Sequence, residues 1–307
     1  MAIGEITLAK AEPVSWRRYY ELTKPKVVML ILFTALVGML LASPGIVPWD
    51  TLVFGLLGIG LAAAAGAVVN HVVDQHIDVV MERTRGRPLP SGRMDAPHAM
   101  AFALILATLA MIVLMVRVNA LTAALTFGAF IGYAVIYTVF LKRSTPQNIV
   151  WGGLAGALPP LLGWTAVTGE VHTHGLLLVL LIFVWTPPHF WALAIKRRQE
   201  YARANIPMLP VTHGVAFTKQ QVFLYTLMLL AVSLMPVFAH MSGLVYLAGA
   251  AGLGLGFVYH AWRLLREPGD AWAMRTFGYS IVYLTALFAV LLVDHYVLLW
   301  LGLAAQS

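Results

Sequence analysis

Repeated runs of about 20 apolar residues, each long enough to cross a bilayer, constrain the fold of this chain more than any other feature. The chain is 60% hydrophobic and 11% charged, with a mean hydropathy of +0.82. Backbone groups in lipid must bond to one another, which favours helices. The sequence therefore predicts an all-α polytopic membrane protein of nine transmembrane helices. The expected spans are 26–43, 51–73, 96–116, 120–140, 148–167, 174–195, 218–239, 243–262 and 276–301.

Lysine and arginine divide unevenly between the two sides of these spans. Nineteen of the 20 fall in the N-terminal segment or in the loops after spans 2, 4, 6 and 8, and the remaining one is Arg117. Cytoplasmic loops carry such an excess of positive charge. We therefore expect a cytoplasmic N-terminus and an outward-facing C-terminus. The nineteen are Lys10, Arg17, Arg18, Lys24, Lys26, Arg83, Arg85, Arg87, Arg93, Lys142, Arg143, Lys196, Arg197, Arg198, Arg203, Lys219, Arg263, Arg266 and Arg275.

The chain divides into an N-terminal segment, 1–25, and a single nine-helix domain, 26–303. The first segment lacks the pattern of a cleaved signal peptide, and its Glu residues are atypical of an organellar transit peptide. We therefore expect a bacterial plasma (inner) membrane. Trp16 and Tyr20, with the cations between them, indicate an interfacial anchor.

Three polar side chains follow one another at four-residue intervals at the end of span 2. Asn70, Asp74 and Asp78 would share one helix face and form a stripe about 12 Å long. Asn and Asp at membrane depth are costly unless they are paired or functional. Two acids on one stripe suggest a divalent cation. The absence of cysteine excludes disulfides and thiolate metal sites.

Basic residues in the predicted cytoplasmic loops supply the complement to these acids. Carboxylates hold Mg²⁺, which bridges to phosphate oxygens, while Lys and Arg donate charge-assisted hydrogen bonds to phosphate. Such a site in an apolar bundle suits an amphiphilic phosphate ester. The chemistry it favours is ionisation of an allylic diphosphate, with the dry bundle protecting the carbocation from water. The cations nearest the stripe in the predicted topology are Arg83, Arg87, Lys142, Arg143 and Lys196.

Several segments match a known pattern. N-x-x-x-D-x-x-x-D at 70–78, followed by MERTRGRPLPSG at 81–92, resembles the first aspartate motif of the intramembrane (UbiA-type) prenyltransferase superfamily. The segments at 137–153, 186–195 and 200–211, among them TPPHFWALAI, are similar to the branch that farnesylates protohaem IX. The likeness covers roughly residues 20–300.

This resemblance implies a nine-helix bundle and a prenyl transfer. The farnesyl group of farnesyl diphosphate would join the vinyl group of haem B, with addition of water, giving haem O and diphosphate. Haem B is then a substrate, and a haem A synthase is the partner that would consume the product. Carried over, the motif assigns the metal and catalytic roles to Asn70, Asp74 and Asp78, with Lys142 as a further catalytic residue. The expected diphosphate-binding residues are Lys24, Arg83, Arg87, Lys142, Arg143 and Lys196.

The second aspartate motif of the superfamily is reduced here. Glu200 and Tyr201 stand where many members have two aspartates four residues apart, and Ala204 occupies the later position. A second metal held wholly by protein carboxylates is therefore not expected. Glu200 either completes the shell of one cation or pairs with Lys196, four residues earlier.

One histidine and one group of glycines allow two interpretations each. His189 follows Pro187 and Pro188 inside span 6, so it either bonds to carbonyls freed by a proline kink or contacts haem. Span 5 carries Gly152, Gly153 and Gly156 before the proline pair 159–160, which should bend it. These glycines either permit close helix packing or leave room for a flat porphyrin.

Three other functions remain open. A transporter would also be polytopic, but it usually binds its substrate near the midplane between related halves, and no internal repeat is visible. A membrane cytochrome would need paired histidines within its helices, and no two histidines here lie about four turns apart on one span. A prenyltransferase acting on an aromatic quinone precursor would keep the fold and change the acceptor.

Overall fold

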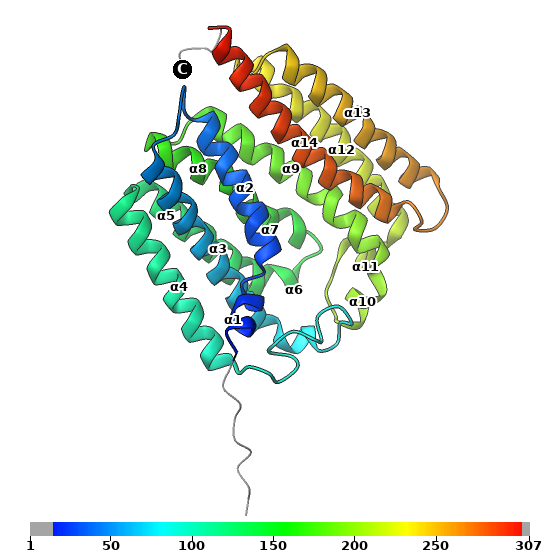
Figure 1. Cartoon of the computed structure of the whole chain (residues 1–307). Coiled ribbons are helices and arrows are strands. Elements are labelled where there is room, and N and C mark those ends of the chain that lie inside the picture. Colours follow the sequence, from blue (N-terminus) through cyan, green and yellow to red (C-terminus); the bar gives the residue numbers. More distant parts are fainter. Residues whose placement is uncertain (1–14, 303–307) are drawn as a thin grey trace, which may run out of the picture.

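A computed structural model describes residues 15–302, and its regular elements are all helical (Figure 1). The predicted all-α class is confirmed. Residues 1–14, with Lys10, and the predicted domain's last residue, 303, lie outside the described residues. The elements are α1 (Trp16–Leu22), α2 (Pro25–Leu41), α3 (Trp49–Asp78), α4 (Ala96–Arg117), α5 (Ala120–Ile131), η1 (Gly132–Leu141), α6 (Lys142–Ser144), α7 (Asn148–Ala157), α8 (Pro159–Thr168), α9 (Thr173–Lys196), α10 (Arg198–Arg203), α11 (Leu209–Thr212), α12 (Gly214–Phe238), α13 (Leu244–Arg266) and α14 (Ala273–Trp300).

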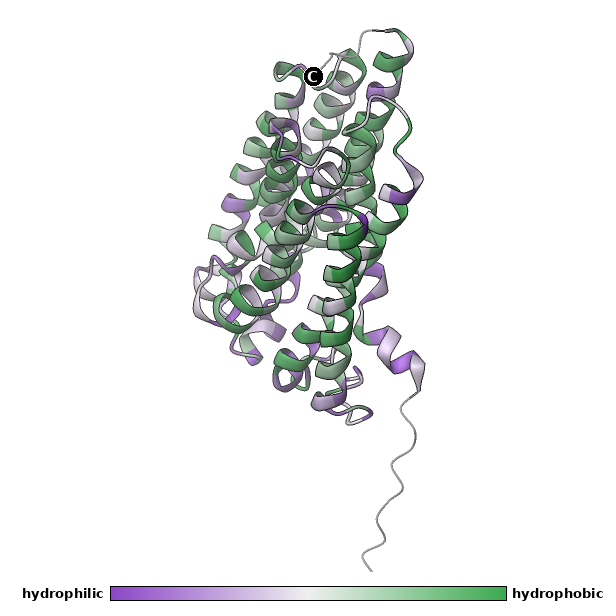
Figure 2. Cartoon of the chain, turned by 90° about the vertical axis from the view of Figure 1, so that its left-hand side faces the viewer, coloured by the Kyte–Doolittle hydropathy of each residue, from purple (hydrophilic) through white to green (hydrophobic). Residues whose placement is uncertain are grey.

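Within 15–302, eight stretches of helix are long and apolar enough to span a membrane, or nine if α1 and α2 count as one bent span. This agrees with the predicted polytopic bundle. The stretch Ala120–Ser144 is continuous through α5, η1 and α6, and Asn148–Thr168 comprises α7 and α8. Hydrophobic residues extend along the length of the helices, and hydrophilic ones gather toward the end that carries α1 (Figure 2). Which end faces the cytoplasm stays a prediction.

The junction between α1 and α2 is a sharp bend at Lys24. The helix axis bends by 53° between α1 and α2. Lys24 has a left-handed φ of 51°, and Pro25 begins α2. Proline suits this first helical position because its missing N–H would have no partner there. In α1, Trp16 is 71% exposed and Tyr20 57% exposed. Their exposure fits the expected interfacial anchor, and the bend turns the Lys24 side chain toward α3.

The predicted effects of the proline pairs differ between two spans. At the first pair, helix is interrupted at Leu158, and α8 begins at Pro159. By contrast, α9 is helical throughout Thr173–Lys196, with Pro187 and Pro188 inside it. Its proline segment lies in the interior, where α9 packs against α7, α12 and α14 (Figure 1). Tertiary packing therefore holds α9 as one helix despite its prolines.

Glycines let α2 and α8 touch backbone to backbone. A Cβ added at Gly163 would lie 1.9 Å from the carbonyl oxygen of Ala35, and one added at Gly38 would lie 2.0 Å from that of Pro160. Both clashes involve backbone atoms, which cannot rotate away. We expect Gly163→Ala to destabilise the bundle by roughly 1–3 kcal/mol, measured as a lower unfolding midpoint in detergent. Gly128→Ala is the matched control, since its Cβ meets nothing within 4 Å; equal midpoints for the two variants would refute the close approach.

Candidate active site

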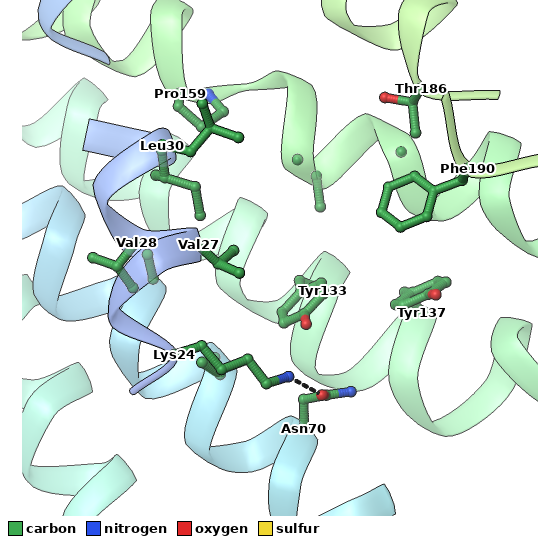
Figure 3. A pocket seen from close by; sticks show the side chains of 18 of the residues that line it. Lys24, Val27, Val28, Leu30, Asn70, Tyr133, Tyr137, Pro159, Thr186 and Phe190 are labelled. Atoms are coloured by element: carbon green, nitrogen blue, oxygen red, sulfur yellow. Dashed lines mark hydrogen bonds between the residues drawn. The ribbon is translucent and has the colours of Figure 1, made fainter. Parts of the chain in front are cut away.

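A cavity of about 690 Å³ opens among α2, α3, η1, α7 and α9. Its size lies within the range of small-molecule sites. Polar side chains gather at one end, where Lys24 reaches Asn70, and apolar side chains frame the rest (Figure 3). Its polar and aromatic lining residues include Lys24, Lys26, Asn70, Asp74, Asp78, Arg83, Arg87, Tyr133, Tyr137, Lys142, Thr186, His189 and Tyr201.

The predicted polar stripe lies on one buried face of α3. Asn70, Asp74 and Asp78 are 5%, 1% and 3% exposed, and all three line the cavity. Asn70 Nδ2 donates to Asp74 Oδ2 at 2.7 Å, the contact expected for side chains one turn apart. The apolar run before the stripe carries these groups into the interior because α3 remains helical through Asp78.

Each member of the stripe meets a cation from another part of the chain. Lys24 donates to Asn70 Oδ1, Lys142 Nζ lies 2.5 Å from Asp74 Oδ2, and Arg87 Nη1 lies 2.6 Å from Asp78 Oδ2. These contacts bring the α1–α2 bend, the start of α6 and the loop after α3 onto one face of α3. Buried acids require such compensation, because an isolated buried charge is very costly.

One buried carboxylate oxygen of the stripe has no hydrogen-bond donor among the described residues. Asp74 Oδ1 is buried and has no hydrogen-bond partner in the described structure, although buried polar atoms rarely lack one. Carboxylate oxygen is the ligand type that Mg²⁺ prefers. No cluster of three or more His, Asp or Glu residues within 15–302 could hold a metal ion by itself. The stripe therefore fits a cation that takes its remaining ligands from elsewhere.

Two arginines of the loop after α3 line the cavity, Arg83 and Arg87, and they differ in their pairing. Arg87 is held by Asp78, whereas Arg83 lines the cavity and forms no ion pair with a described carboxylate. Arg83 is exposed, and Tyr201 of α10, 9% exposed, lines the same cavity. Burial raises the pKa of Tyr201 above its usual value, with Arg83 and Arg197 opposing the shift. The phenol is thus neutral near pH 7 and keeps its hydrogen for donation.

Three of the residues predicted for the site lie off the cavity. Arg143 is exposed and donates to the carbonyl of Val73 at 3.3 Å. Lys196 Nζ lies 3.8 Å from Asp270 Oδ1, so the alternative in which Lys196 pairs with Glu200 is wrong. Glu200 instead lies 3.6 Å from Arg197, because the α9–α10 junction turns Lys196 toward the loop before α14. The second oxygen of Glu200, Oε2, is buried without a partner.

His189 lines the cavity from α9, 8% exposed. Its Nδ1 lies 2.6 Å from Ser280 Oγ on α14, so the alternative in which His189 bonds to carbonyls freed by the prolines is wrong. Ser280 Oγ donates to the carbonyl of Phe277 at 2.6 Å, which leaves it to accept from Nδ1–H. Nε2 then carries the lone pair, and it has no hydrogen-bond partner within 15–302. Trp185 and Phe277 stack on the ring at 4.2 and 4.6 Å and fix its plane.

Sequence reasoning missed several positioning contacts. Thr138, fully buried in η1, accepts from Asn70 Nδ2 at 3.3 Å and donates to the carbonyl of Tyr133 at 2.7 Å. Tyr133 and Tyr137 stack with centroids 5.8 Å apart and face the cavity (Figure 3). Thr138 lies four residues before Lys142, and that spacing was the available signal. Ser280 lies 91 residues from His189, and no local pattern marks it.

Solved structures resemble this bundle at low sequence identity. A chain solved in work on digeranylgeranylglyceryl phosphate synthase superposes with a TM-score of 0.78 at 19% identity, covering 91% of this chain and 98% of that one. A UbiA homologue from Archaeoglobus fulgidus, bound to GPP and Mg²⁺, gives a TM-score of 0.62 at 16% identity, covering 89% of this chain and 99% of its own. These likenesses establish the fold.

Curated relatives are much closer in sequence. A protein of Thioalkalivibrio sulfidiphilus named protoheme IX farnesyltransferase is 70% identical over 97% of this chain and 98% of its own length. One of Nitrosococcus oceani with the same name is 60% identical over 95% of this chain and 97% of its own. The model of the UbiA prenyltransferase family matches residues 31–282. The predicted intramembrane prenyltransferase is confirmed, and the chain belongs to the UbiA prenyltransferase family.

Proposed function

We propose that this chain transfers the farnesyl group of farnesyl diphosphate to the vinyl group of haem B, with addition of water, giving haem O and diphosphate. The observation that carries the proposal is the cavity itself, which joins a paired acid stripe to a long apolar interior. The names of the 60–70% identical relatives support the same reaction. Family membership also favours an enzyme over a transporter or a resident cytochrome.

Asn70, Asp74 and Asp78 would hold a divalent cation, which we propose is Mg²⁺. The buried, unpartnered Asp74 Oδ1 supports this role, as does the Mg²⁺ bound with GPP by the Archaeoglobus fulgidus homologue. When bound, the cation would neutralise charge on the departing diphosphate. Because Asp78 and the second oxygen of Asp74 already pair with cations, the substrate's phosphates would complete the cation's shell.

The cations that now pair with the stripe would turn to the diphosphate. Lys24, Lys142 and Arg87 lie within hydrogen-bond distance of the stripe, so small side-chain rotations bring their donors to a phosphate bound there. As the C1–O bond of the substrate breaks, its electron pair leaves with diphosphate, and preorganised donors at that oxygen lower the barrier. Thr138 fixes the Asn70 side chain through a hydrogen bond, and Asn70 in turn positions Lys24.

The apolar interior protects the allylic cation until the haem vinyl group attacks it. His189 is our candidate haem contact, because Nε2 keeps its lone pair on a ring held by stacking. Haem B is the acceptor and does not stay bound as a cofactor. We place the chain in a bacterial inner membrane with this cavity toward the cytoplasm, and a haem A synthase would consume the product.

The direct test supplies purified chain with haem B, farnesyl diphosphate and Mg²⁺. We expect diphosphate release together with a pigment heavier than haem B by one farnesyl group and one hydroxyl. Mass analysis distinguishes the acceptors when an aromatic quinone precursor is offered in parallel. A prenylated benzoate in place of the haem product would move the chain to the other branch of the family, and no diphosphate release with either acceptor would reject the proposed function.

A further inference from the structure

The three glycines of α7 have different structural roles. A Cβ at Gly152 would lie 2.2 Å from the ring of Tyr137, and one at Gly153 would lie 2.8 Å from Thr186 Cγ2. Both glycines are therefore needed for packing. Gly156 also lines the cavity, yet a Cβ there would meet nothing within 4 Å. Its missing side chain leaves space open inside the cavity.

Flat side chains surround this part of the cavity. Tyr133 and Tyr137 form a stacked pair with an interplanar angle of 17°, and Figure 3 shows Phe190 opposite Tyr137. Phe190 is 38% exposed, so its ring is available for contact. Aromatic faces of this kind stack on planar conjugated ligands. His189, beside Phe190 on α9, adds a nitrogen lone pair without a described partner.

The α2 side of the cavity has a different character. Val27, Val28 and Leu30 lie there, across the gap from Phe190 (Figure 3). Small residues of α3 also line the cavity and add aliphatic surface to the surface of α2. They are Ala62, Ala63, Gly66 and Ala67. An isoprenoid chain matches this surface in shape and polarity.

We propose that the acceptor has its own subsite against α7, in the space left by Gly156, while the farnesyl chain lies along α2 and α3. This inference rests on the proposed function, because it assumes that the acceptor is a porphyrin. The porphyrin plane lies between the Tyr133–Tyr137 pair and Phe190. Gly156 is thus a specificity-determining residue for a large planar acceptor.

Arg83 completes this subsite at the mouth of the cavity. The vinyl and propionate groups of haem lie at opposite edges of the ring. α3 rises about 12 Å over the eight residues from Asn70 to Asp78, and Arg83 follows beyond them. A vinyl at the depth of Asn70, beside the diphosphate end of the farnesyl chain, therefore puts the propionates at the mouth. Arg83 lines the cavity without a carboxylate partner among the described residues, next to Tyr201, and both can donate to a propionate.

Binding of each substrate by itself tests the assignment. Haem B binding is followed by its absorbance on titration into the full chain in lipid nanodiscs, and farnesyl diphosphate binding is followed with radiolabelled ligand. We expect Gly156→Leu to weaken haem B at least tenfold and to leave farnesyl diphosphate within twofold. Gly128→Leu is the control, a helical glycine with equal open space that does not line the cavity.

A second pair of variants tests the mouth. The subsite gives Arg83 a role toward the acceptor in place of the diphosphate contact expected from the sequence. We therefore expect Arg83→Gln to weaken haem B several-fold and to leave farnesyl diphosphate within twofold, with Arg85→Gln, in the same loop but off the cavity, as control. The inference is overturned if Gly156→Leu binds haem B as the unchanged chain does, or if it loses farnesyl diphosphate instead. Failure of the proposed function is a separate result, in which the unchanged chain forms no farnesylated haem at all.

Discussion

Replacing Asp74 by asparagine is expected to lower turnover about a thousandfold, the scale of removing a preorganised electrostatic group from an active site. Asparagine keeps the shape and one acceptor oxygen, so Lys142 retains a hydrogen-bond partner. What disappears is the negative charge, together with the buried Oδ1 that has no donor. Steady-state diphosphate release measures the loss, and the unfolding midpoint in detergent should change little.

Asp294→Asn is the matched control for that experiment. Asp294 is also buried, at 1% exposed, but it lies in α14 and accepts from the backbone N–H groups of Gly243 and Tyr246, at the start of α13. For Asp294→Asn we expect the reverse pattern, with a lower unfolding midpoint in detergent and turnover retained in the folded fraction. If Asp74→Asn were active, or lost activity only by unfolding, the stripe would be structural.

Binding of the divalent cation is expected to depend on the diphosphate. In the chain alone, Lys142 and Arg87 lie 2.5 and 2.6 Å from the two acids, so a cation must compete with them. A phosphate draws these donors away and supplies oxygens of its own. We expect Mn²⁺, used as a paramagnetic probe, to bind at least tenfold more tightly with farnesyl diphosphate present, and excess chelator to abolish turnover.

The control for cation binding is farnesol, which has the same apolar chain without phosphate. We expect farnesol to leave Mn²⁺ affinity unchanged, because it brings no oxygens that could join Asp74 in the shell. Tight Mn²⁺ binding to the chain alone would contradict a site in which Lys142 and Arg87 already neutralise the two acids. Restoration of turnover by Mg²⁺ after chelation separates loss of the cation from damage to the protein.

Sequence predicted most of the fold because lipid leaves a chain few alternatives. Apolar runs located the helices within a few residues, as with 51–73 inside α3 and 174–195 inside α9. What it could not predict was decided by packing. The ten-residue π-helix Gly132–Leu141 looks like any apolar helix in sequence, and α9 keeps its prolines without a break because its neighbours support it.

The site was predictable where it depends on one helix, and less so where several segments meet. Four-residue spacing placed Asn70 and Asp74 on one face without any tertiary information. Which cation meets which acid depends on how the loops fold back, so Lys196 was expected at the site and instead faces Asp270. Likewise, Ser280 comes to His189 from a helix 91 residues away.

The partners of the stripe also set an order of assembly during synthesis. Asp78 finds Arg87 nine residues later, but Asp74 must wait for Lys142, 68 residues later and beyond α4 and α5. Because chains emerge N-terminus first, α3 enters the bilayer while Asp74 still lacks its countercharge. We therefore expect the acidic end of α3 to reach its final depth only after η1 and α6 arrive, so that the active site forms late in the assembly of this half of the bundle.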